Sequence, residues 1–390
     1  MADRFRSFRV ADKRRESDII TSFHLVPADG APLWPVRPGQ YLTLRMPDAE
    51  AAAGAPVLKT YSVSNDVAET GHHRITVKRE AGQSGAPDGL GSCWLHDRIE
   101  PGDEIAIAAP RGSFVLDEAS QRPVLLLSGG VGLTPLVSML HSLKDSGRDV
   151  YFIHACENGA VHALRDEVEA LKGGNIRALF VYRSPSEADR SAARHHAEGV
   201  IDKAFLQDHV PIGDYEAYMC GPAPFMAAMY QLLQELGLPK DRIAYEFFGK
   251  AMSLDQMSAA PTDAPSRAAS NAAASIRSLT FLTNPDAWAS DDTTVEVAPK
   301  AAPDAALGDV TFRKSGKAAT WDGTSSSLLE LAEAAGLTPE FSCRAGICNT
   351  CKCALVSGEV EYFEDPLNPP APGEVLICCA RPKGAVVLDI

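Results

Sequence analysis

The 390-residue chain contains no run of the roughly 18 apolar residues that a membrane-spanning helix requires. It also lacks a block of Lys and Arg, and its formal net charge is −14, so the clustered cations that bind nucleic-acid phosphates are missing. The first residues, Met1 to Arg6, lack the apolar core of a secretory signal. These absences predict a cytoplasmic protein that neither spans a membrane nor binds nucleic acid.

The composition is that of an ordinary globular protein, with 45% hydrophobic and 23% charged residues. At roughly 100–200 residues per domain, the length predicts two to four domains. Residues 1–118 contain alternating apolar and polar runs at 41–46, 73–78 and 105–107, separated by Pro- and Gly-containing turns. Several short strands at this spacing predict an antiparallel β-barrel.

The pattern changes over residues 119–250, where continuous apolar runs alternate with helical periodicity. Strands buried on both faces and connected by helices indicate a parallel, doubly wound α/β sheet. Strands are expected at 124–128, 150–154, 178–182 and 217–220, and helices at 135–143, 162–171 and 224–236.

Residues 251–307 interrupt this pattern, since nine of the first twenty-five are Ala and five are Ser. Such a composition predicts a linker between domains. Residues 308–390 are expected to form a further domain with an early hairpin. A helix is predicted over 327–335, with Ser326 or Ser327 as its N-cap.

Nine cysteines need an explanation other than disulfides, because their number is odd and the expected compartment is reducing. Cys343, Cys348 and Cys351 have the spacing C-x4-C-x2-C, and Cys378 follows twenty-seven residues later. This is the plant-type [2Fe–2S] ferredoxin spacing, in which four thiolates hold two irons. A structural zinc site is the alternative, although zinc sites favour C-x2-C pairs in both halves.

Cys378 and Cys379 are adjacent, so either of them could be the fourth ligand of the cluster. The segment around them resembles the ferredoxin ending in which the first cysteine is the ligand, which favours Cys378. Cys353 follows Cys351 by two residues in a strand-like run and is expected to contribute to packing. Small residues such as Ala345 and Gly346 are expected to let backbone N–H groups approach the sulfur atoms.

A second signal lies at Lys59, Tyr61 and Ser62. The segment resembles the R-x-Y-[ST] motif of the ferredoxin–NADP⁺ reductase superfamily, with Lys59 in the place of the usual Arg. The resemblance implies that Tyr61 lies against the flavin ring and that Ser62 hydrogen-bonds near the reactive flavin nitrogen. Lys59 is expected at the flavin phosphate, where an ammonium keeps the charge of Arg but not its fork.

The following residues continue the order of motifs in that superfamily. Val77 and Lys78 are expected to contact the flavin cofactor. Gly89, Gly91 and Ser92 resemble the G-x-x-S motif, in which the start of a helix presents backbone N–H groups to a pyrophosphate. FAD contains a pyrophosphate whereas FMN does not, so this motif implies FAD.

Nicotinamide-nucleotide motifs follow in the α/β region. A glycine-rich turn after the strand at 124–128 resembles the superfamily's nucleotide loop, since glycines let the backbone approach a phosphate. The residues expected at the nucleotide in this loop are Gly130, Gly132 and Thr134.

The C-G-P motif of the superfamily is matched by Cys220, Gly221 and Pro222, which are expected near the nicotinamide. Cys220 is therefore expected in the catalytic site with Tyr61 and Ser62. Phe248 resembles the aromatic residue that ends the domain near the flavin ring.

The resemblance covers residues 1–250 and 308–390. It implies three domains, namely an antiparallel β-barrel that binds FAD, an α/β doubly wound domain that binds NAD(P), and an α+β β-grasp ferredoxin domain. The reductase half is most similar to that of flavohaemoglobins, without the globin. The whole is similar to reductase components of Rieske-type oxygenases and to the reductase of the hybrid-cluster protein.

These motifs together predict an electron-transfer oxidoreductase. A nicotinamide donates two electrons as hydride and a cluster accepts one at a time, whereas a flavin can do both. The expected partner is the terminal oxygenase of a monooxygenase system. A Rieske-type oxygenase is favoured over a P450 or a diiron enzyme. Another redox protein, such as the hybrid-cluster protein, is the alternative. A redox-sensing module is a third hypothesis, but no stretch is left over for an effector domain.

The choice between NADH and NADPH depends on the end of the second strand of the α/β region. Glu157 stands there and would repel a 2′-phosphate, which favours NADH. Arg183, at the end of the next strand, keeps NADPH open as the alternative.

Overall fold

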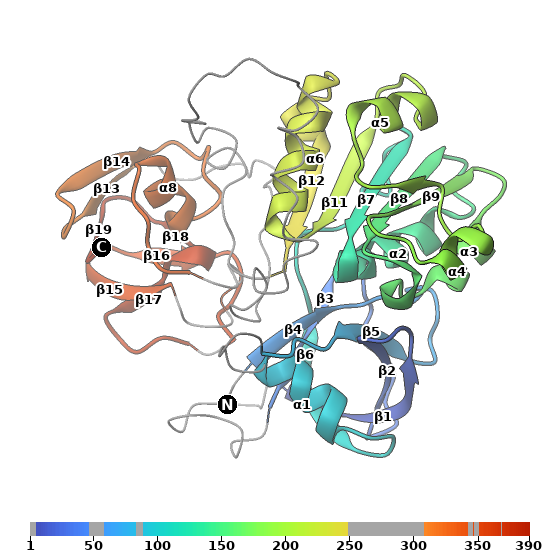
Figure 1. The fold of residues 1–390 in the computed structure, drawn as a ribbon. Coiled ribbons are helices and arrows are strands. Elements are labelled where there is room, and N and C mark those ends of the chain that lie inside the picture. Colours follow the sequence, from blue (N-terminus) through green and yellow to red (C-terminus); the bar gives the residue numbers. More distant parts are fainter. Residues whose placement is uncertain are drawn as a thin grey trace. The chain divides into compact units, whose positions relative to one another are not determined.

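The computed structural model describes residues 5–46, 58–82, 89–248, 308–341, 346, 351–367 and 369–390. The described residues up to Phe248 form one compact unit, and those from Gly308 onward form another (Figure 1). The linker predicted over 251–307 lies outside the described residues, so that prediction and the exact domain boundaries stay predictions.

The first unit begins with an antiparallel sheet of six strands. Their bounds are β1 Phe5–Arg15, β2 Ile20–Pro27, β3 Tyr41–Arg45, β4 Leu58–Ser62, β5 His73–Lys78 and β6 Glu104–Arg111. Within the sheet the order is β4-β3-β6-β1-β2-β5. The runs predicted as strands at 41–46, 73–78 and 105–107 correspond to β3, β5 and β6.

The sheet closes into the predicted β-barrel because its two edge strands also meet. Val63, directly after β4, forms an antiparallel bridge with Ile75 of β5. Ser64 donates its N–H to the Arg74 carbonyl at 2.8 Å. Apolar side chains fill the interior, among them Phe8, Phe23, Leu42, Leu44 and Ile107.

Strand β1 carries many charged residues, yet it belongs to the barrel because its side chains alternate. Phe8 and Val10 are fully buried, whereas the intervening Arg9 is exposed. The short helix α1 (Leu90–Arg98) adds Trp94 and Leu95 to the same core.

A parallel sheet of six strands forms the second part of this unit. Its strands are β7 Val124–Gly129, β8 Val150–Cys156, β9 Ile176–Tyr182, β10 Ala197–Glu198, β11 Glu216–Gly221 and β12 Ile243–Phe247. Their order is β10-β9-β8-β7-β11-β12, and every neighbouring pair is parallel. The order reverses between β7 and β11, which is the switch point where open α/β sheets bind ligands.

Helices cover both faces of the parallel sheet. They are α2 Leu133–Leu143, α3 Arg165–Leu171, α4 Glu187–Ser191, α5 Lys203–His209 and α6 Ala223–Glu235. Leu127 and Ile153 face one side, where residues of α5 and α6 pack on them. Leu126 and Phe152 face the other side and are equally buried, next to α2. Strands buried on both faces explain the continuous apolar runs in the sequence.

The helix predicted over 162–171 is shorter than the periodicity suggested. Helix α3 begins at Arg165, because Leu164 has a φ of 53° and breaks the helical backbone. His162 lies before this break, and its Nδ1 is 2.8 Å from Tyr182 Oη at the end of β9. The apolar pattern of 162–164 therefore reflects packing against the sheet and not a helical turn.

The second unit is a small α+β domain. Its elements are β13 Gly308–Phe312, β14 Lys317–Trp321, α8 Leu328–Ala334, β15 Lys352–Ser357, β16 Val360–Tyr362, β17 Glu374–Leu376, β18 Ala380–Pro382 and β19 Val386–Leu388. A sheet of order β14-β13-β19-β15-β17 contains the predicted hairpin β13–β14, while β16 and β18 form a separate pair. The N-cap of α8 is Ser327, whose side chain accepts the N–H of Glu330. Trp321 and Leu331 pack in the core between helix and sheet.

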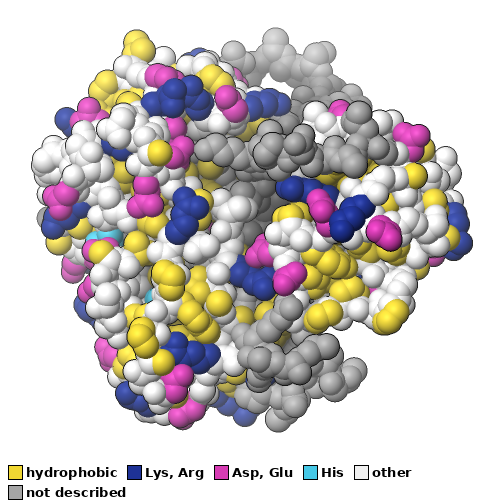
Figure 2. All heavy atoms as spheres, turned by 180° about the vertical axis from the view of Figure 1, so that it is seen from behind, with side chains coloured by type: hydrophobic (Ala, Val, Ile, Leu, Met, Phe, Trp, Pro, Cys, Tyr) yellow, Lys and Arg dark blue, Asp and Glu magenta, His cyan; other side chains and the backbone are white. Residues whose placement is uncertain are grey.

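Among the described residues, no helix combines the length and apolar character needed to cross a membrane. On the face drawn in Figure 2, Lys and Arg side chains lie in small groups among acidic and neutral ones.

Candidate functional site

Two glycine-containing turns meet at the switch point of the parallel sheet. The first is the 3-10 turn η3 (Gly130–Gly132), which connects β7 to α2, and Gly130 has a φ of 54°. The second connects β11 to α6, with Pro222 as the N-cap residue of α6. A Cβ on Gly132 would overlap with the carbonyl group of Cys220. The turns are therefore packed backbone against backbone.

The same close approach involves the glycine of the second turn. A Cβ on Gly221 would lie 3.1 Å from Gly129 Cα and 2.8 Å from the Phe225 ring. Thr134, buried in the first turn of α2, donates its hydroxyl to the Val131 carbonyl at 3.2 Å. Glycine at these positions thus has a packing role in addition to the predicted exposure of backbone N–H groups to a phosphate.

A polar contact joins the barrel to the parallel sheet beside these turns. Ser62, the last residue of β4, donates its hydroxyl to Glu246 Oε2 of β12 at 3.4 Å. Cys220 of β11 is the register partner of Glu246 on the neighbouring strand. Glu246 and Cys220 are fully buried, and Ser62 is 4% exposed. The structure therefore brings together two of the three predicted catalytic residues, Ser62 and Cys220.

Glu246 is the residue that the sequence analysis missed at this site. Burial raises the pKa of its carboxyl group to about 8, and the hydrogen bond from Ser62 only partly offsets this effect. Burial, together with the nearby Glu246 carboxylate, raises the pKa of the Cys220 thiol well above its usual range. Glu246 Oε1 has no hydrogen-bond partner among the described residues. In the sequence, its signal is a carboxylate that stands between the aromatic residues Tyr245 and Phe247.

The other flavin-motif residues of β4 lie on the opposite face of the strand from Ser62. Lys59 and Tyr61 are both half-buried, whereas Thr60 and Ser62 are buried, as the two-residue period of a strand requires. Lys59 and Tyr61 therefore share a face on which an elongated ligand can contact both. Phe248, which directly follows β12, is half-buried.

The residues predicted around the pyrophosphate lie at the ends of β5 and α1. Val77 is buried, and its carbonyl accepts a hydrogen bond from His96 Nε2 at 2.9 Å. Lys78 Nζ lies 3.0 Å from Glu80 Oε1. Ser92 Oγ accepts the N–H of Glu80 at 3.2 Å and donates to the Gly89 carbonyl at 3.3 Å.

Because the Ser92 hydroxyl is used within the chain, an anion at the start of α1 would be bound through backbone N–H groups. Gly89 is the N-cap residue of α1, and Gly91 lies in its first turn. The backbone N–H groups at the start of a helix attract a phosphate, and glycines let it approach closely.

The barrel and the parallel sheet are also held together away from the switch point. The two terminal guanidinium nitrogens of Arg74 donate to the Glu167 carboxylate of α3, at 2.6 and 2.8 Å. His141 Nε2 of α2 lies 2.6 Å from Glu167 Oε1. Burial alone would raise the pKa of Glu167, but the bonds from His141 and Arg74 hold this pKa at about 2. Glu167 is therefore ionised and fixes β5 against α2 and α3.

The choice between NADH and NADPH depends on two residues at adjacent strand ends. Glu157 directly follows β8, and Arg183 directly follows β9. Arg183 donates its N–H to the Cys156 carbonyl at 3.0 Å, and Ser184 donates to the Glu157 carbonyl at 2.8 Å. Glu157 Oε2 is buried without a hydrogen-bond partner among the described residues.

In the second unit, two of the four predicted cluster ligands are described, and Cys343 and Cys348 lie outside the described residues. Cys351 and Cys378 are both buried. Gly346, with a φ of 67°, donates its N–H to Cys378 Sγ at 3.4 Å. A buried thiol that accepts a backbone N–H is the environment expected of a [2Fe–2S] ligand, so the donor set is suited to the cluster.

The neighbouring cysteines have different surroundings. Cys379 is fully buried, its Sγ donates to the Leu376 carbonyl at 3.6 Å, and a Cβ on Gly346 would meet this sulfur at 2.8 Å. Cys353 packs against the core of the domain, and burial raises the pKa of its thiol to about 12. Both cysteines thus have packing contacts in the described structure.

Three known domain families match the chain. They are "Oxidoreductase FAD-binding domain" at residues 8–116, "Oxidoreductase NAD-binding domain" at 126–231 and "2Fe-2S iron-sulfur cluster binding domain" at 311–383. These matches confirm the predicted cofactor classes and the predicted three-part fold.

Individual relatives match parts or all of the chain. The flavohemoprotein of Bacillus subtilis (strain 168) is 43% identical over 257 residues, which make up 65% of this chain and 61% of the relative. The chain thus spans less than two thirds of that relative. The FAD/NAD-binding domain of nitric oxide dioxygenase from Vibrio cholerae O1 biovar El Tor is 34% identical with a TM-score of 0.56, over 62% of this chain and 98% of that domain.

Solved structures also match the chain over nearly its whole length, among them an oxygenase reductase. Phthalate dioxygenase reductase, described as a modular structure for electron transfer from pyridine nucleotides to [2Fe-2S], is 22% identical with a TM-score of 0.52. The match covers 99% of this chain and 98% of that protein. At this identity the match shows that the fold is shared.

Proposed function

The chain belongs to the ferredoxin reductase-like oxidoreductases that combine FAD-binding, NAD-binding and [2Fe–2S] domains, and on this premise we propose that it passes electrons from NADH to a separate terminal oxygenase. Bound FAD would take a hydride from the nicotinamide and release electrons singly to the cluster. The remaining roles belong to residues of the chain.

The observation that supports this proposal best is the contact between Ser62 of the barrel and Glu246 of the parallel sheet, beside Cys220. A hydride can transfer only if the flavin and the nicotinamide lie face to face, so the residues that hold them must converge. Ser62 comes from the flavin motif, and Cys220 from the nicotinamide motif. Both residues lie next to the buried Glu246 carboxyl group, so the two motifs converge as a hydride-transfer site requires.

Glu246 would hold the proton of this site. With a pKa of about 8, most of its carboxyl groups are protonated at pH 7. A neutral carboxylic acid can exchange a proton with Ser62 Oγ without placing a negative charge beside the incoming hydride. Cys220, buried and neutral, would shape the apolar pocket for the nicotinamide.

NADH is the proposed donor because Glu157 presents a carboxylate at the end of β8. In parallel nucleotide-binding sheets this position meets the ribose, where a carboxylate disfavours a 2′-phosphate. We expect kcat/KM for NADH to exceed that for NADPH by at least about tenfold, and Glu157→Gln to reduce this ratio. An unchanged ratio in the variant, with steady-state kinetics measured for both nucleotides, would contradict this role of Glu157.

A Rieske-type oxygenase is the proposed acceptor, and the shared fold with phthalate dioxygenase reductase supports it. A P450 or diiron oxygenase, or the hybrid-cluster protein, would receive electrons from the same cluster. A sensor module is not favoured, because the matched families have oxidoreductase descriptions.

Acceptor reduction tests the proposed function. The purified holoprotein with NADH should reduce ferricyanide and should support product formation by a purified Rieske oxygenase. Cys351→Ser should keep FAD and ferricyanide reduction but lose most of the oxygenase-coupled turnover, because ferricyanide takes electrons before the cluster.

Three outcomes would contradict the proposal in distinct ways. Zinc in place of iron would exclude the cluster, and FMN in place of FAD would exclude the pyrophosphate site. Rapid reduction of the hybrid-cluster protein or a P450, with none of the Rieske protein, would move the proposal to that acceptor.

A further inference from the structure

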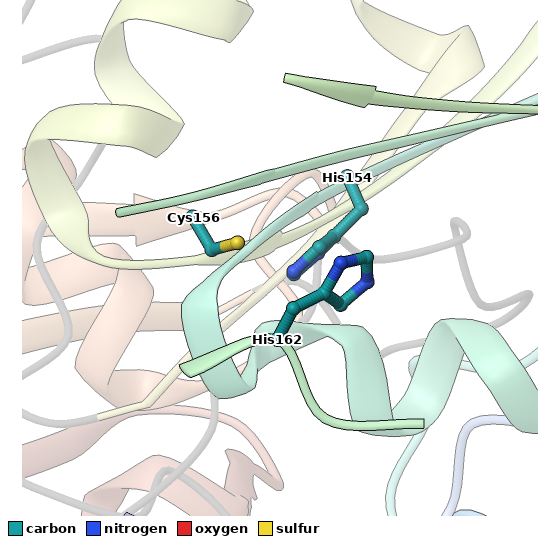
Figure 3. A group of neighbouring side chains, drawn as sticks. All are labelled: His154, Cys156 and His162. Atoms are coloured by element: carbon teal, nitrogen blue, oxygen red, sulfur yellow. The ribbon is translucent and has the colours of Figure 1, made fainter. Parts of the chain in front are cut away.

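Three potential metal ligands lie together in the parallel-sheet part of the first unit, apart from the Ser62–Glu246 contact (Figure 3). His154 and Cys156 are two residues apart on β8, so they share one face of the strand. His162 follows the 3-10 turn η4 (Gly159–Val161). One ligand atom of each residue lies within 4.8 Å of the other two. All three residues are almost completely buried, with exposures of 1%, 3% and 4%.

Each imidazole is already oriented by a hydrogen bond on its Nδ1. Ser128 Oγ lies 2.8 Å from His154 Nδ1 and itself donates to the Ile153 carbonyl at 3.4 Å. With the Ser128 hydroxyl donated to this carbonyl, the Nδ1 of His154 would carry the ring proton, and its Nε2 would keep a lone pair for a metal. Tyr182 Oη lies 2.8 Å from His162 Nδ1. Metal-binding histidines are oriented by such bonds on the nitrogen that does not bind the metal.

The Nε2 atoms of both histidines are buried and have no hydrogen-bond partner among the described residues. An unpaired buried polar atom is costly, so native structures seldom leave such an atom without a partner. The two rings lie with centroids 4.5 Å apart and an interplanar angle of 32°. Ring packing alone accounts for this contact, but it leaves both nitrogen atoms unsatisfied. A bound cation would satisfy them.

From this arrangement we propose that His154, Cys156 and His162 form a buried Zn²⁺ site through two imidazole nitrogens and one thiolate. Two nitrogens and one sulfur are a donor set that zinc prefers. Tetrahedral zinc places its ligand atoms roughly 3.5 Å apart, so the side chains must close in by about 1 Å. Binding releases the Cys156 thiol proton to solvent, because the thiolate is the ligand.

The surroundings of Cys156 suit the charge of such a site. Two neutral imidazoles and one thiolate leave Zn²⁺ with one positive charge. The carboxylates of Glu157 and Asp189 interact electrostatically with the Cys156 thiol and would balance this charge.

Metal analysis of the full-length holoprotein tests the proposal. After equilibration with Zn²⁺ and removal of loosely bound metal, we expect one zinc per chain in addition to the cluster iron, measured by mass spectrometry. Cys156→Ala and His162→Ala should each lose this zinc and keep the iron. Cys93→Ala removes another buried cysteine, outside the cluster, and should keep both metals.

X-ray absorption at the zinc edge identifies the ligands without interference from iron. We expect one sulfur at about 2.3 Å and two imidazole nitrogens at about 2.0–2.1 Å. Variants that lose zinc must keep their FAD and flavin spectrum, and His162→Gln serves where His162→Ala does not fold. Less than 0.1 zinc per chain in the folded wild type would overturn the proposal. Equal zinc in all variants, or a zinc spectrum dominated by several sulfurs, would overturn it as well.

Discussion

At the scale of single residues, the buried carboxyl group of Glu246 has the largest consequence for the site. It is the register partner of Cys220, and it accepts the hydroxyl of Ser62. Its pKa of about 8 results mainly from burial, which favours the neutral acid. The charge state of the site therefore changes within the range of pH in which enzymes are assayed.

The first prediction concerns this titration. Glu246 is neutral below pH 8 and anionic above it, and an anion opposes the negative charge that hydride transfer delivers to the flavin. We expect the rate of flavin reduction by NADH, measured by stopped-flow absorbance, to fall as the pH rises through about 8.

Glu246→Gln is the matched variant, since an amide of similar shape does not ionise. It should remove the fall near pH 8 while the flavin stays bound. A variant with the same pH profile as the wild type would show that another group titrates.

The second prediction separates the adjacent cysteines of the cluster domain. Cys378 Sγ accepts the N–H of Gly346, whereas Cys379 Sγ packs against the same glycine and donates to a carbonyl. Cys378→Ser should therefore lose the visible absorbance and most of the iron of the cluster, and Cys379→Ala should keep them. The reverse result would assign the ligand to Cys379.

At the scale of elements, the two glycine-containing turns determine how β7 and β11 end. The backbone of η3 rests directly on the end of β11, and no side chain fits between them at Gly132. Because the two turns are closely packed, the start of α2 lies beside Cys220 and Gly221 of the nicotinamide motif. Nucleotides bind to open α/β sheets at such a switch point.

The third prediction follows from this packing. Gly132→Ala must push the two turns apart, because its Cβ would overlap with the Cys220 carbonyl group. We expect the KM for NADH to rise at least about tenfold and the unfolding free energy to fall by about 1–3 kcal/mol, as for an overpacked core. Steady-state kinetics and thermal unfolding measure both effects.

Gly71→Ala is the control, because Gly71 has open space around the position of a Cβ and an ordinary φ. It should leave both quantities unchanged. A Gly132→Ala variant with normal KM and stability would contradict the packing argument.

At the scale of the whole molecule, the chain consists of two compact units joined by a segment that lies outside the described residues. The first unit contains the matched FAD-binding and NAD-binding domains, and the second contains the matched 2Fe-2S domain. Residues 308–390 carry eleven Asp and Glu against seven Lys and Arg, a net charge of −4. Such a surface favours a basic partner, and its effect on association weakens with salt.

The fourth prediction is that the ferredoxin domain exchanges between a position near the flavin and one at its partner. The Ala-, Ser- and Pro-rich composition of 251–307 supports this prediction. Limited proteolysis should cut between Ala251 and Ala306 and release a folded fragment that retains the cluster. Cytochrome c reduction should fall after cleavage and with added salt, whereas ferricyanide reduction should not.

Resistance of this segment to protease in the oxidised protein would contradict the predicted exchange. A salt-independent rate of cytochrome c reduction would contradict the electrostatic part alone.

The sequence by itself determined the class of each domain and the cofactor motifs, because these depend on local patterns. Alternating residues predict strands of a barrel, continuous apolar runs predict a buried parallel sheet, and C-x4-C-x2-C predicts a cluster. The fold class and the cofactor classes predicted in this way are confirmed.

Only the tertiary structure decided which distant residues meet. Ser62 and Glu246 are 184 residues apart, and their contact depends on how the barrel docks on the parallel sheet. The late start of the helix predicted over 162–171 depends on the backbone at Leu164, and His162, which precedes this start, lies beside His154. Such pairings depend on long-range packing, which no local pattern encodes, and this is why the buried carboxyl group and the histidine–cysteine cluster escaped the sequence analysis.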